Sequence, residues 1–375
     1  MKVTNSDMAW RRSCDGAHKA KRILAIAFKI LPLAAFVLSP LGRAGAPSAQ
    51  TSPWLVNAIY REPVWGQSFR SIVGLAKDAV SGELYVLDAG RRTIDVLDST
   101  GVVRFSFGHW FTDSKTGQRQ LGEPNSLAVT EAGEIFITDF YSNRVDVLNI
   151  RGEIVGQIDV LAAIGWDDAA CRPEKLALDG VGWLYISIAG ERNGIARCRT
   201  DGSDCTLFID AAAEKIDCIT GMSAARDGRI GVLDYRGVPA ARVYDPSGHL
   251  AVSFSGHDVS AGDLSYPVGF VFADDGTYWV ADALRHAVKH FSAAGEYLDY
   301  IGGYGGEPGA LRYPTSLSGN GVSQLYVAER VGRRVQEYIL PTAPAAPTPA
   351  PVLDATRAGA VATTPEIENS RVNNQ

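Results

Sequence analysis

The sequence has few residues of the kinds that carry out chemistry. It holds five Cys and six His among 375 residues. The cysteines lack C-x-x-C spacing, which argues against a structural zinc site. A G-x-S-x-G nucleophile motif and a P-loop are both missing. His109 and His257 stand at equivalent places after a strand and are expected to be loop or surface residues. The sequence therefore predicts no catalytic residue, no metal and no cofactor.

Helical periodicity is also missing. The chain instead shows short runs rich in Val, Ile and aromatic residues, separated by Gly, Asp or Asn, and it contains 39 glycines. Runs of this kind are strand and hairpin signals. We therefore expect an all-β fold with many turns.

A long apolar run lies near the N-terminus, at residues 23–42. Basic residues precede it and small residues follow it, which is the pattern of a secretory signal. We predict that residues 1–49 form a Sec-type signal peptide, with cleavage after Ala46 or Ala49, and that the protein is periplasmic or extracellular. The alternative is an anchor in the inner membrane, because about 20 apolar residues can span a bilayer.

The rest of the chain is acidic. Residues 1–46 hold eight of the 36 Lys and Arg and two of the 42 Asp and Glu, so the remainder has 28 basic and 40 acidic residues, a net charge of −12. Such a surface repels nucleic acid and anionic membranes. At the other end, residues 341–375 are rich in Pro, Ala and Thr and cannot bury a core. We expect a disordered tail there and a single folded domain at residues 52–340.

The central part of the chain repeats itself. An acidic residue ends an apolar run in five copies, and Ile188 takes its place in one. The steps between these positions are 51, 49, 46, 48 and 47 residues, and a turn glycine keeps the same period. Each copy contains four short runs. A four-stranded antiparallel unit of this length is typical of a β-propeller blade.

The two ends of the repeat fix the number of blades. The last copy lacks its fourth run, and a lone strand-like run at residues 54–63 precedes the first copy. Exposed sheet edges promote aggregation, so a propeller must close its ring. We predict a six-bladed β-propeller of four-stranded antiparallel blades. Its first blade starts near Ser71, and its N-terminal strand completes the last blade.

The residues of the copies resemble a known family. The stretch "PNSLAVTEAGEIFITDFYSNRVDVLNIRGEIVGQI" at residues 124–158 is similar to an NHL repeat, with an opening Pro, a Gly before an apolar run ending in Asp, a loop ending in Arg, and a turn Gly. Residues 266–303 are similar as well. The resemblance covers residues 71–340 and is weakest in the third and fourth copies. It implies a propeller that serves as a binding platform, a scaffold or occasionally an enzyme, and it leaves the chemistry open.

The recurring acid and Arg flank the same loop in the copies that have both, so we expect them on one face of the ring. One interpretation is structural, because a guanidinium can bridge carboxylates and carbonyls. The predicted struts are Asp88, Asp139, Arg144, Asp234, Asp282, Glu329 and Arg334.

In several loops Arg has left the family position, and two Tyr add aromatic surface to the same face. Exposed Tyr next to Arg is common in binding surfaces. We therefore predict a basic face that binds a protein or an anionic polymer. The candidate residues are Arg91, Arg92, Tyr141, Tyr235, Arg236, Arg285, Arg330 and Arg333.

The alternative function is that of a channel enzyme. Six-bladed propellers include lactonases and lyases that hold a metal in the central channel. The weak candidates for ligands here are Asn125 and Glu174. Two oxygen-bearing blades of six make a poor calcium site, which needs six to eight oxygens.

The cysteines suggest disulfides. Cys14 lies in the predicted signal, and the other four lie within 48 residues. An even number in an exported protein favours disulfides. Cys198 and Cys205 flank a turn, whereas Cys171 and Cys218 precede the first strands of adjacent blades and could bridge them.

Overall fold

The computed structural model describes residues 54–62, 67–78, 80–112, 116–166 and 170–340. The predicted signal peptide or anchor at residues 1–49 and the predicted tail at residues 341–375 lie outside the described residues. Within the described part, no helix is long and apolar enough to cross a membrane.

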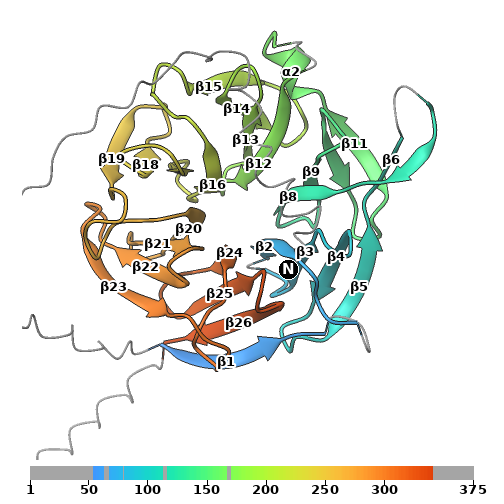
Figure 1. Ribbon diagram of the computed structural model, residues 1–375. Helices are drawn as coiled ribbons and strands as arrows, with labels where there is room; N and C mark the ends of the chain where they lie inside the picture. Colours follow the sequence, from blue (N-terminus) through green and yellow to red (C-terminus); the bar gives the residue numbers. More distant parts are fainter. Residues whose placement is uncertain (1–53, 63–66, 79, 113–115, 167–169, 341–375) are drawn as a thin grey trace, which may run out of the picture. The chain divides into compact units, whose positions relative to one another are not determined.

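Six four-stranded antiparallel sheets surround a central axis, as predicted (Figure 1). In each sheet, successive strands of the chain pair with one another from the axis outward. The first three blades are β2 (Ile72–Lys77), β3 (Leu84–Asp88), β4 (Thr93–Leu97) and β5 (Val103–Gly108); β8 (Pro124–Val129), β9 (Ile135–Asp139), β10 (Val145–Leu148) and β11 (Ile154–Ile158); and β12 (Arg172–Leu178), β13 (Trp183–Ala189), β14 (Gly194–Arg199) and β15 (Thr206–Asp210).

The other three blades follow the same order. They are β16 (Ile219–Ala224), β17 (Ile230–Asp234), β18 (Ala241–Tyr244) and β19 (Leu250–Phe254); β20 (Pro267–Phe272), β21 (Tyr278–Asp282), β22 (Ala287–Phe291) and β23 (Tyr297–Gly302); and β24 (Pro314–Gly319), β25 (Gln324–Glu329) and β26 (Arg334–Ile339), completed by β1 (Leu55–Tyr60).

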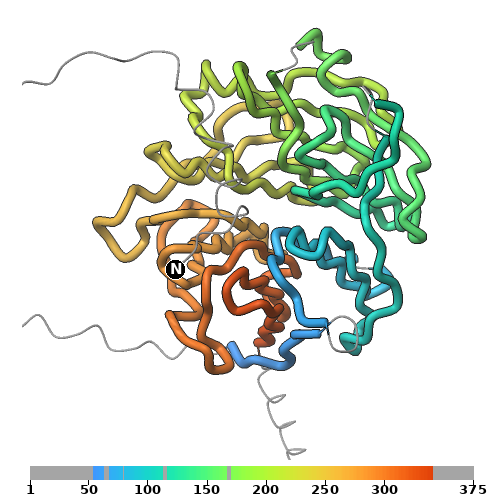
Figure 2. Tube along the Cα trace, turned by 45° about the vertical axis from the view of Figure 1, so that its right-hand side comes forward, coloured from blue at the N-terminus to red at the C-terminus, as the bar shows by residue number. Residues whose placement is uncertain are grey.

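The N-terminal strand closes the ring. β1 pairs antiparallel with β26, from Leu55 opposite Ile339 to Tyr60 opposite Val335. Figures 1 and 2 both show this first strand beside the last strands of the chain. The Glu337 carboxylate accepts a hydrogen bond from the Asn57 side chain at 2.8 Å. The predicted closure is therefore confirmed, and the outer edge of blade six is covered.

Two short insertions interrupt the regular pattern. A hairpin of β6 (Trp110–Thr112) and β7 (Arg119–Leu121) lies between blades one and two. A single helical turn, α2 (Val160–Ala163), follows blade two, and the Asp159 side chain caps its N-terminus by accepting from the Ala162 N–H. Neither insertion was expected from the sequence, because each is too short to show a period.

The core lies between neighbouring blades rather than at one centre. Six clusters of buried apolar side chains each join two adjacent sheets. Between blades one and two, for example, Tyr85 and Leu87 of β3 pack with Leu127 of β8 and Ile135 of β9. Each fully buried side chain of this size contributes roughly 1.5–3 kcal/mol. Every blade therefore depends on both neighbours for its stability.

The recurring acid fixes the start of its own blade. Asp88 is fully buried, and its carboxylate accepts hydrogen bonds from the N–H groups of Arg70 at 2.8 Å and Ser71 at 2.9 Å, just before β2. Asp282 likewise accepts from the N–H groups of Ser265 at 2.7 Å and Tyr266 at 3.0 Å, before β20. We call this arrangement the acid latch. Asp234 repeats it before β16, and Glu329 repeats it with one N–H before β24.

Two of these acids are paired with an Arg, which comes from a different sequence position in each blade. The Arg334 guanidinium is buried against Glu329, and its other nitrogens donate to backbone carbonyls, including that of Ala310 at 2.7 Å. In blade four, Arg242 pairs with Asp234 at 3.3 Å. Asp88 and Asp282 form no ion pair with any described residue, and the backbone N–H groups that they accept stabilise their charge instead.

Blade two uses a histidine for this purpose. The expectation that His109 is a loop or surface residue is wrong, because its side chain is fully buried. Its Nδ1 lies 2.9 Å from Asp139 and its Nε2 lies 2.7 Å from Asp146. Burial alone would lower the pKa of His109, but the hydrogen bonds and charges of the two carboxylates raise it to about 9. The protonated ring donates to both acids.

Arg144 does not occupy the predicted strut position. Its Nε lies 3.2 Å from Asp159, and both side chains are about half exposed. Because His109 already neutralises Asp139 from the preceding inter-blade loop, the Arg of the family motif is left at the surface in this blade.

One predicted disulfide is confirmed and one is wrong. Cys198 and Cys205 are bonded across the turn between β14 and β15, with their Cα atoms 4.1 Å apart. Cys171 is a free, buried thiol whose sulfur lies 3.7 Å from the Arg192 carbonyl, so it does not bridge to Cys218. The bond links β14 to the residue just before β15 in blade three, the blade in which Ile188 takes the place of the acid that forms the latch elsewhere.

The raised pKa of His109 predicts a pH-dependent stability. The folded-state pKa of about 9 exceeds the ordinary value near 6.5, so the stabilisation is complete below pH 6.5 and is lost as the pH rises through 9. We expect the free energy of unfolding, measured by urea titration, to fall by roughly 3 kcal/mol between pH 6 and pH 10.

Two variants isolate this effect. His109→Gln should flatten the pH profile, whereas His249→Gln should leave it unchanged, because His249 is largely exposed. An equally steep profile in His109→Gln, or an NMR titration of His109 with a midpoint near 6.5, would contradict the assignment.

Candidate functional site

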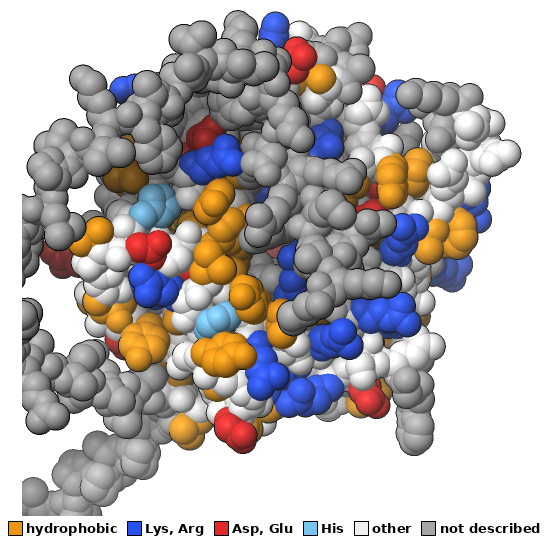
Figure 3. All heavy atoms as spheres, viewed as in Figure 1, with side chains coloured by type: hydrophobic (Ala, Val, Ile, Leu, Met, Phe, Trp, Pro, Cys, Tyr) orange, Lys and Arg blue, Asp and Glu red, His pale blue; other side chains and the backbone are white. Residues whose placement is uncertain are grey.

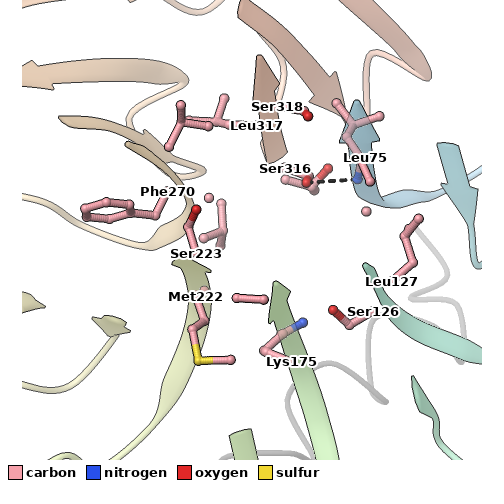
Figure 4. Close-up of a pocket in the computed structure, with 18 of the residues that line it drawn as sticks. Leu75, Ser126, Leu127, Lys175, Met222, Ser223, Phe270, Ser316, Leu317 and Ser318 are labelled. Atoms are coloured by element: carbon pink, nitrogen blue, oxygen red, sulfur yellow. Dashed lines mark hydrogen bonds between the residues drawn. The ribbon is translucent and has the colours of Figure 1, made fainter. Parts of the chain in front are cut away.

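The first strands of the six blades surround a central channel. β2, β8, β12, β16, β20 and β24 line it, and its volume is about 1570 Å³ (Figure 4). One mouth is formed by the loops that join second and third strands, and the other by the turns that join first and second strands. We call the former the loop face.

Each first strand carries a β-bulge where it approaches the axis. The residue that ends the bulge is Gly in blades one, four and five and Ser in blades two and six. A Cβ on Gly221, for instance, would lie 2.6 Å from the Val268 carbonyl oxygen of the next blade. Blade three differs, because Lys175 lies within its bulge and projects into the channel. The chain therefore places one long cationic side chain where the others are small.

Hydroxyl side chains on the wall tie neighbouring blades together. Thr315 donates to the Ile72 carbonyl at 3.0 Å, and Thr220 donates to the Pro267 carbonyl at 2.6 Å. Three serines act in the opposite sense and accept backbone N–H groups of the adjacent blade. They are Ser126 from Leu176 at 3.1 Å, Ser316 from Leu75 at 3.1 Å and Ser318 from Lys77 at 2.9 Å.

Asn125 and Glu174, the two weak candidates for metal ligands, also take part in hydrogen bonding between neighbouring blades. The Asn125 amide donates to the Glu174 carbonyl at 3.2 Å, and its Oδ1 accepts from the Lys175 ammonium at 3.4 Å. The Glu174 carboxylate is buried and pairs with Arg172 at 3.1 Å. Across residues 54–340, apart from the short gaps noted above, no group of three or more His, Cys, Asp or Glu side chains is placed to hold a metal ion.

The predicted basic ring is largely neutralised. The Arg91 side chain is only 8% exposed and pairs with buried Asp95 at 2.7 Å, so Arg91 lies beneath the loop face. Arg236 and Arg285 lie on this face but pair with acids. The distances are 3.5 Å from Arg236 to Asp217, 2.8 Å from Arg285 to Asp258 and 3.9 Å from Arg92 to Glu123. The expectation of a uniformly basic ring is thus corrected to a ring of mostly exposed ion pairs.

The predicted tyrosines are divided between surface and packing roles. Tyr141 is exposed, stacks on Phe111 at 6.2 Å between ring centroids and donates to Glu123 at 3.3 Å. Tyr235 packs against Tyr266 with centroids 4.5 Å apart. They lie in different blades and form no common cluster with each other.

A cluster of exposed apolar and aromatic side chains lies at one sector of the loop face. We call it the mouth patch. Its Tyr304 is 73% exposed, and the His286 ring lies between Tyr304 and Tyr313, with centroids 4.9 and 4.6 Å away. The Tyr313 N–H donates to His286 Nδ1 at 3.1 Å, and burial lowers the pKa of His286. The patch consists of Leu284, His286, Tyr304, Tyr313, Val331 and Arg333.

The mouth patch adjoins the channel. Leu284, Tyr313 and Val331 also line the channel mouth, together with Arg330. On the face shown in Figure 3, Lys and Arg side chains gather over blades six and one, next to hydrophobic side chains over blade five. Sequence reasoning found Arg330 and Arg333 but missed Tyr304 and Tyr313, because their Gly-rich loop resembled an ordinary inter-blade connection.

Comparisons with known proteins bear on the fold alone. No protein-family profile and no curated protein matches the sequence. Among solved structures, the chain is similar to a luciferin-regenerating enzyme at 14% identity and a TM-score of 0.53, over 75% of this chain and 94% of that one. It is similar to a catalytically inactive virginiamycin B lyase from Staphylococcus aureus with quinupristin at 12% identity and a TM-score of 0.51, over 76% and 99%. A protein of unknown function from Bacteroides thetaiotaomicron matches at 13% and 0.51, over 73% and 70%.

The burial of the loop arginines predicts which of them stabilise the fold. Arg91→Ala leaves Asp95 buried without its cation and should lower the free energy of unfolding by about 3–5 kcal/mol. Arg285→Ala removes an exposed pair and should change it by less than about 1 kcal/mol. Urea unfolding measures both. Equal effects of the two substitutions would show that the burial of Arg91 does not set its role.

Proposed function

We propose that this protein is an exported, non-catalytic propeller of the NHL type that binds a partner protein on its loop face. The family assignment is supported by the repeat motif in the sequence and by the six-bladed fold. Two solved structures of similar fold are enzymes by their names, but at 12–14% identity their activities carry no weight for this chain.

The observation that carries the proposal is the mouth patch. Soluble proteins rarely gather exposed apolar and aromatic side chains at one site unless it is an interaction surface. Tyr and Arg are also the residues that most often dominate binding energy. Tyr304 and Val331 are both more than half exposed, and Arg333, two residues after Val331, is exposed as well.

The charge of the patch suggests the character of the partner. Arg333 makes no ion pair with any described residue, unlike Arg92, Arg236 and Arg285. It is therefore available to a carboxylate of the partner, whereas the paired arginines would first have to break existing contacts. A protein segment with apolar and acidic residues fits this surface better than a uniformly charged polymer.

The alternative of a metal-dependent channel enzyme has no specific observation in its favour. Its candidate residues, Asn125 and Glu174, are engaged with each other and with Arg172. Export is supported by the Cys198–Cys205 bond, because disulfides persist in oxidising compartments.

Site-specific photo-crosslinking tests the binding surface. With p-benzoylphenylalanine in place of Tyr304, irradiation of the producing cells should yield a discrete adduct. The same probe at Val181, an exposed residue in a turn between a first and a second strand, should not. Arg333→Glu should reduce the adduct at least several-fold. Adducts of equal yield at both positions would rule out the mouth patch as the binding site.

Cell fractionation tests export. The full chain should be recovered outside the cytoplasm with its Cys198–Cys205 bond resistant to thiol-specific labelling. A variant lacking residues 1–49 should remain in the cytoplasm. Recovery of the two forms from the same compartment would contradict the predicted signal.

A further inference from the structure

The middle of the channel presents hydrogen-bond donors that have no matching acceptors. Ser126, Ser316 and Ser318 each use their oxygen to accept a backbone N–H from the next blade. Each hydroxyl therefore keeps its own hydrogen for another partner. Within the described part of the chain, these three hydroxyl groups donate to no acceptor.

Lys175 adds a cationic donor to the same part of the channel. Figure 4 shows Lys175 and Ser126 side by side on the wall. The ammonium makes one long hydrogen bond to the described residues, 3.4 Å to Asn125 Oδ1. The adjacent Glu174 carboxylate is held by Arg172, so it does not neutralise Lys175 directly.

The surroundings make this charge costly. Burial lowers the pKa of Lys175, with Glu174 opposing the shift and Arg330 reinforcing it. A partly buried cation that has no ion-pair partner is stabilised by a close counterion. An acceptor with negative charge would supply that counterion and would also satisfy the serine hydroxyl beside it.

Part of the wall is apolar. Met222 of β16 and Val268 and Phe272 of β20 line the channel and are only partly buried, whereas Phe270 and Leu317 point away from it into the core between blades (Figure 4). Ligand sites commonly combine an apolar enclosure with a few convergent polar groups that orient the ligand. A molecule with an apolar body and one terminal anion is complementary to both parts of this channel.

We propose that the channel binds a small amphipathic carboxylate, with its carboxylate on Lys175 and Ser126 and its apolar part against the walls of blades four and five. This site is separate from the mouth patch and does not depend on the proposed protein partner. Lys77, the other lysine of the channel wall, is not part of it, because its ammonium donates to the Gly82 carbonyl and lies 5.2 Å from the Tyr326 ring.

Isothermal titration with three probes that each carry an unbranched ten-carbon chain tests the site. Protein expressed from the full coding sequence and purified should bind decanoate with one-to-one stoichiometry, at least tenfold more tightly than decanol. Decyltrimethylammonium should not bind in the channel, because its cation would face Lys175.

Substitutions test whether Lys175 causes the preference for decanoate over decanol. Lys175→Met should weaken decanoate binding at least tenfold and leave decanol binding unchanged, and Lys77→Met should preserve the preference. If Lys175→Met fails to fold, Lys175→Ser provides the same test with the residue that blades two and six carry at this position. Equal affinity for decanoate and decanol, undetectable decanoate binding, or an unchanged preference in the Lys175 variants would overturn the proposal.

Discussion

The propeller depends on a carboxylate that is buried at the end of a second strand. In blade five, Asp282 accepts the N–H groups of Ser265 and Tyr266 and so fixes the chain as it enters β20. These N–H groups lie where the chain passes from one blade to the next and have no strand partner there. Since the same strand lines the channel, the latch also sets the position of the channel wall. The same geometry recurs at Asp88, Asp234 and Glu329, whereas Asp139 bonds to His109 and to the Tyr141 N–H instead.

The group that neutralises the recurring acid differs between blades, and this difference affects which Arg side chains reach the surface. Where the neutralising cation is an Arg of the same blade, as with Arg334, its side chain is buried against the acid and does not reach the surface. Where it comes from elsewhere, as with His109, the Arg of the motif is released to the surface. In blade two, the exposure of Arg144 is thus explained by how the acid of the same loop is neutralised. We expect the loop face to bind a partner where an exposed Arg lies near exposed apolar residues, as proposed for the mouth patch.

Much of the fold was predictable from the sequence, and much of the site was not. The period of the acid and the missing fourth run of the last copy were enough to predict six blades and the closure by β1, because both follow from strand count. The fate of individual side chains was not, because Arg91 and Arg285 look alike in the sequence yet one is buried and the other exposed. Lys175 and Tyr304 were missed for a related reason. Their significance comes from positions on the ring that only the assembled blades create.

Hydrogen exchange of backbone amides in an Asp282→Ala variant tests the acid latch most directly. If the latch is correct, the amides of Ser265 and Tyr266 lose their protection in this variant, while those of Arg70 and Ser71, which Asp88 holds in blade one, keep theirs. Unchanged protection of Ser265 and Tyr266 would show that the carboxylate does not fix the start of its blade and would contradict the central role given to it here.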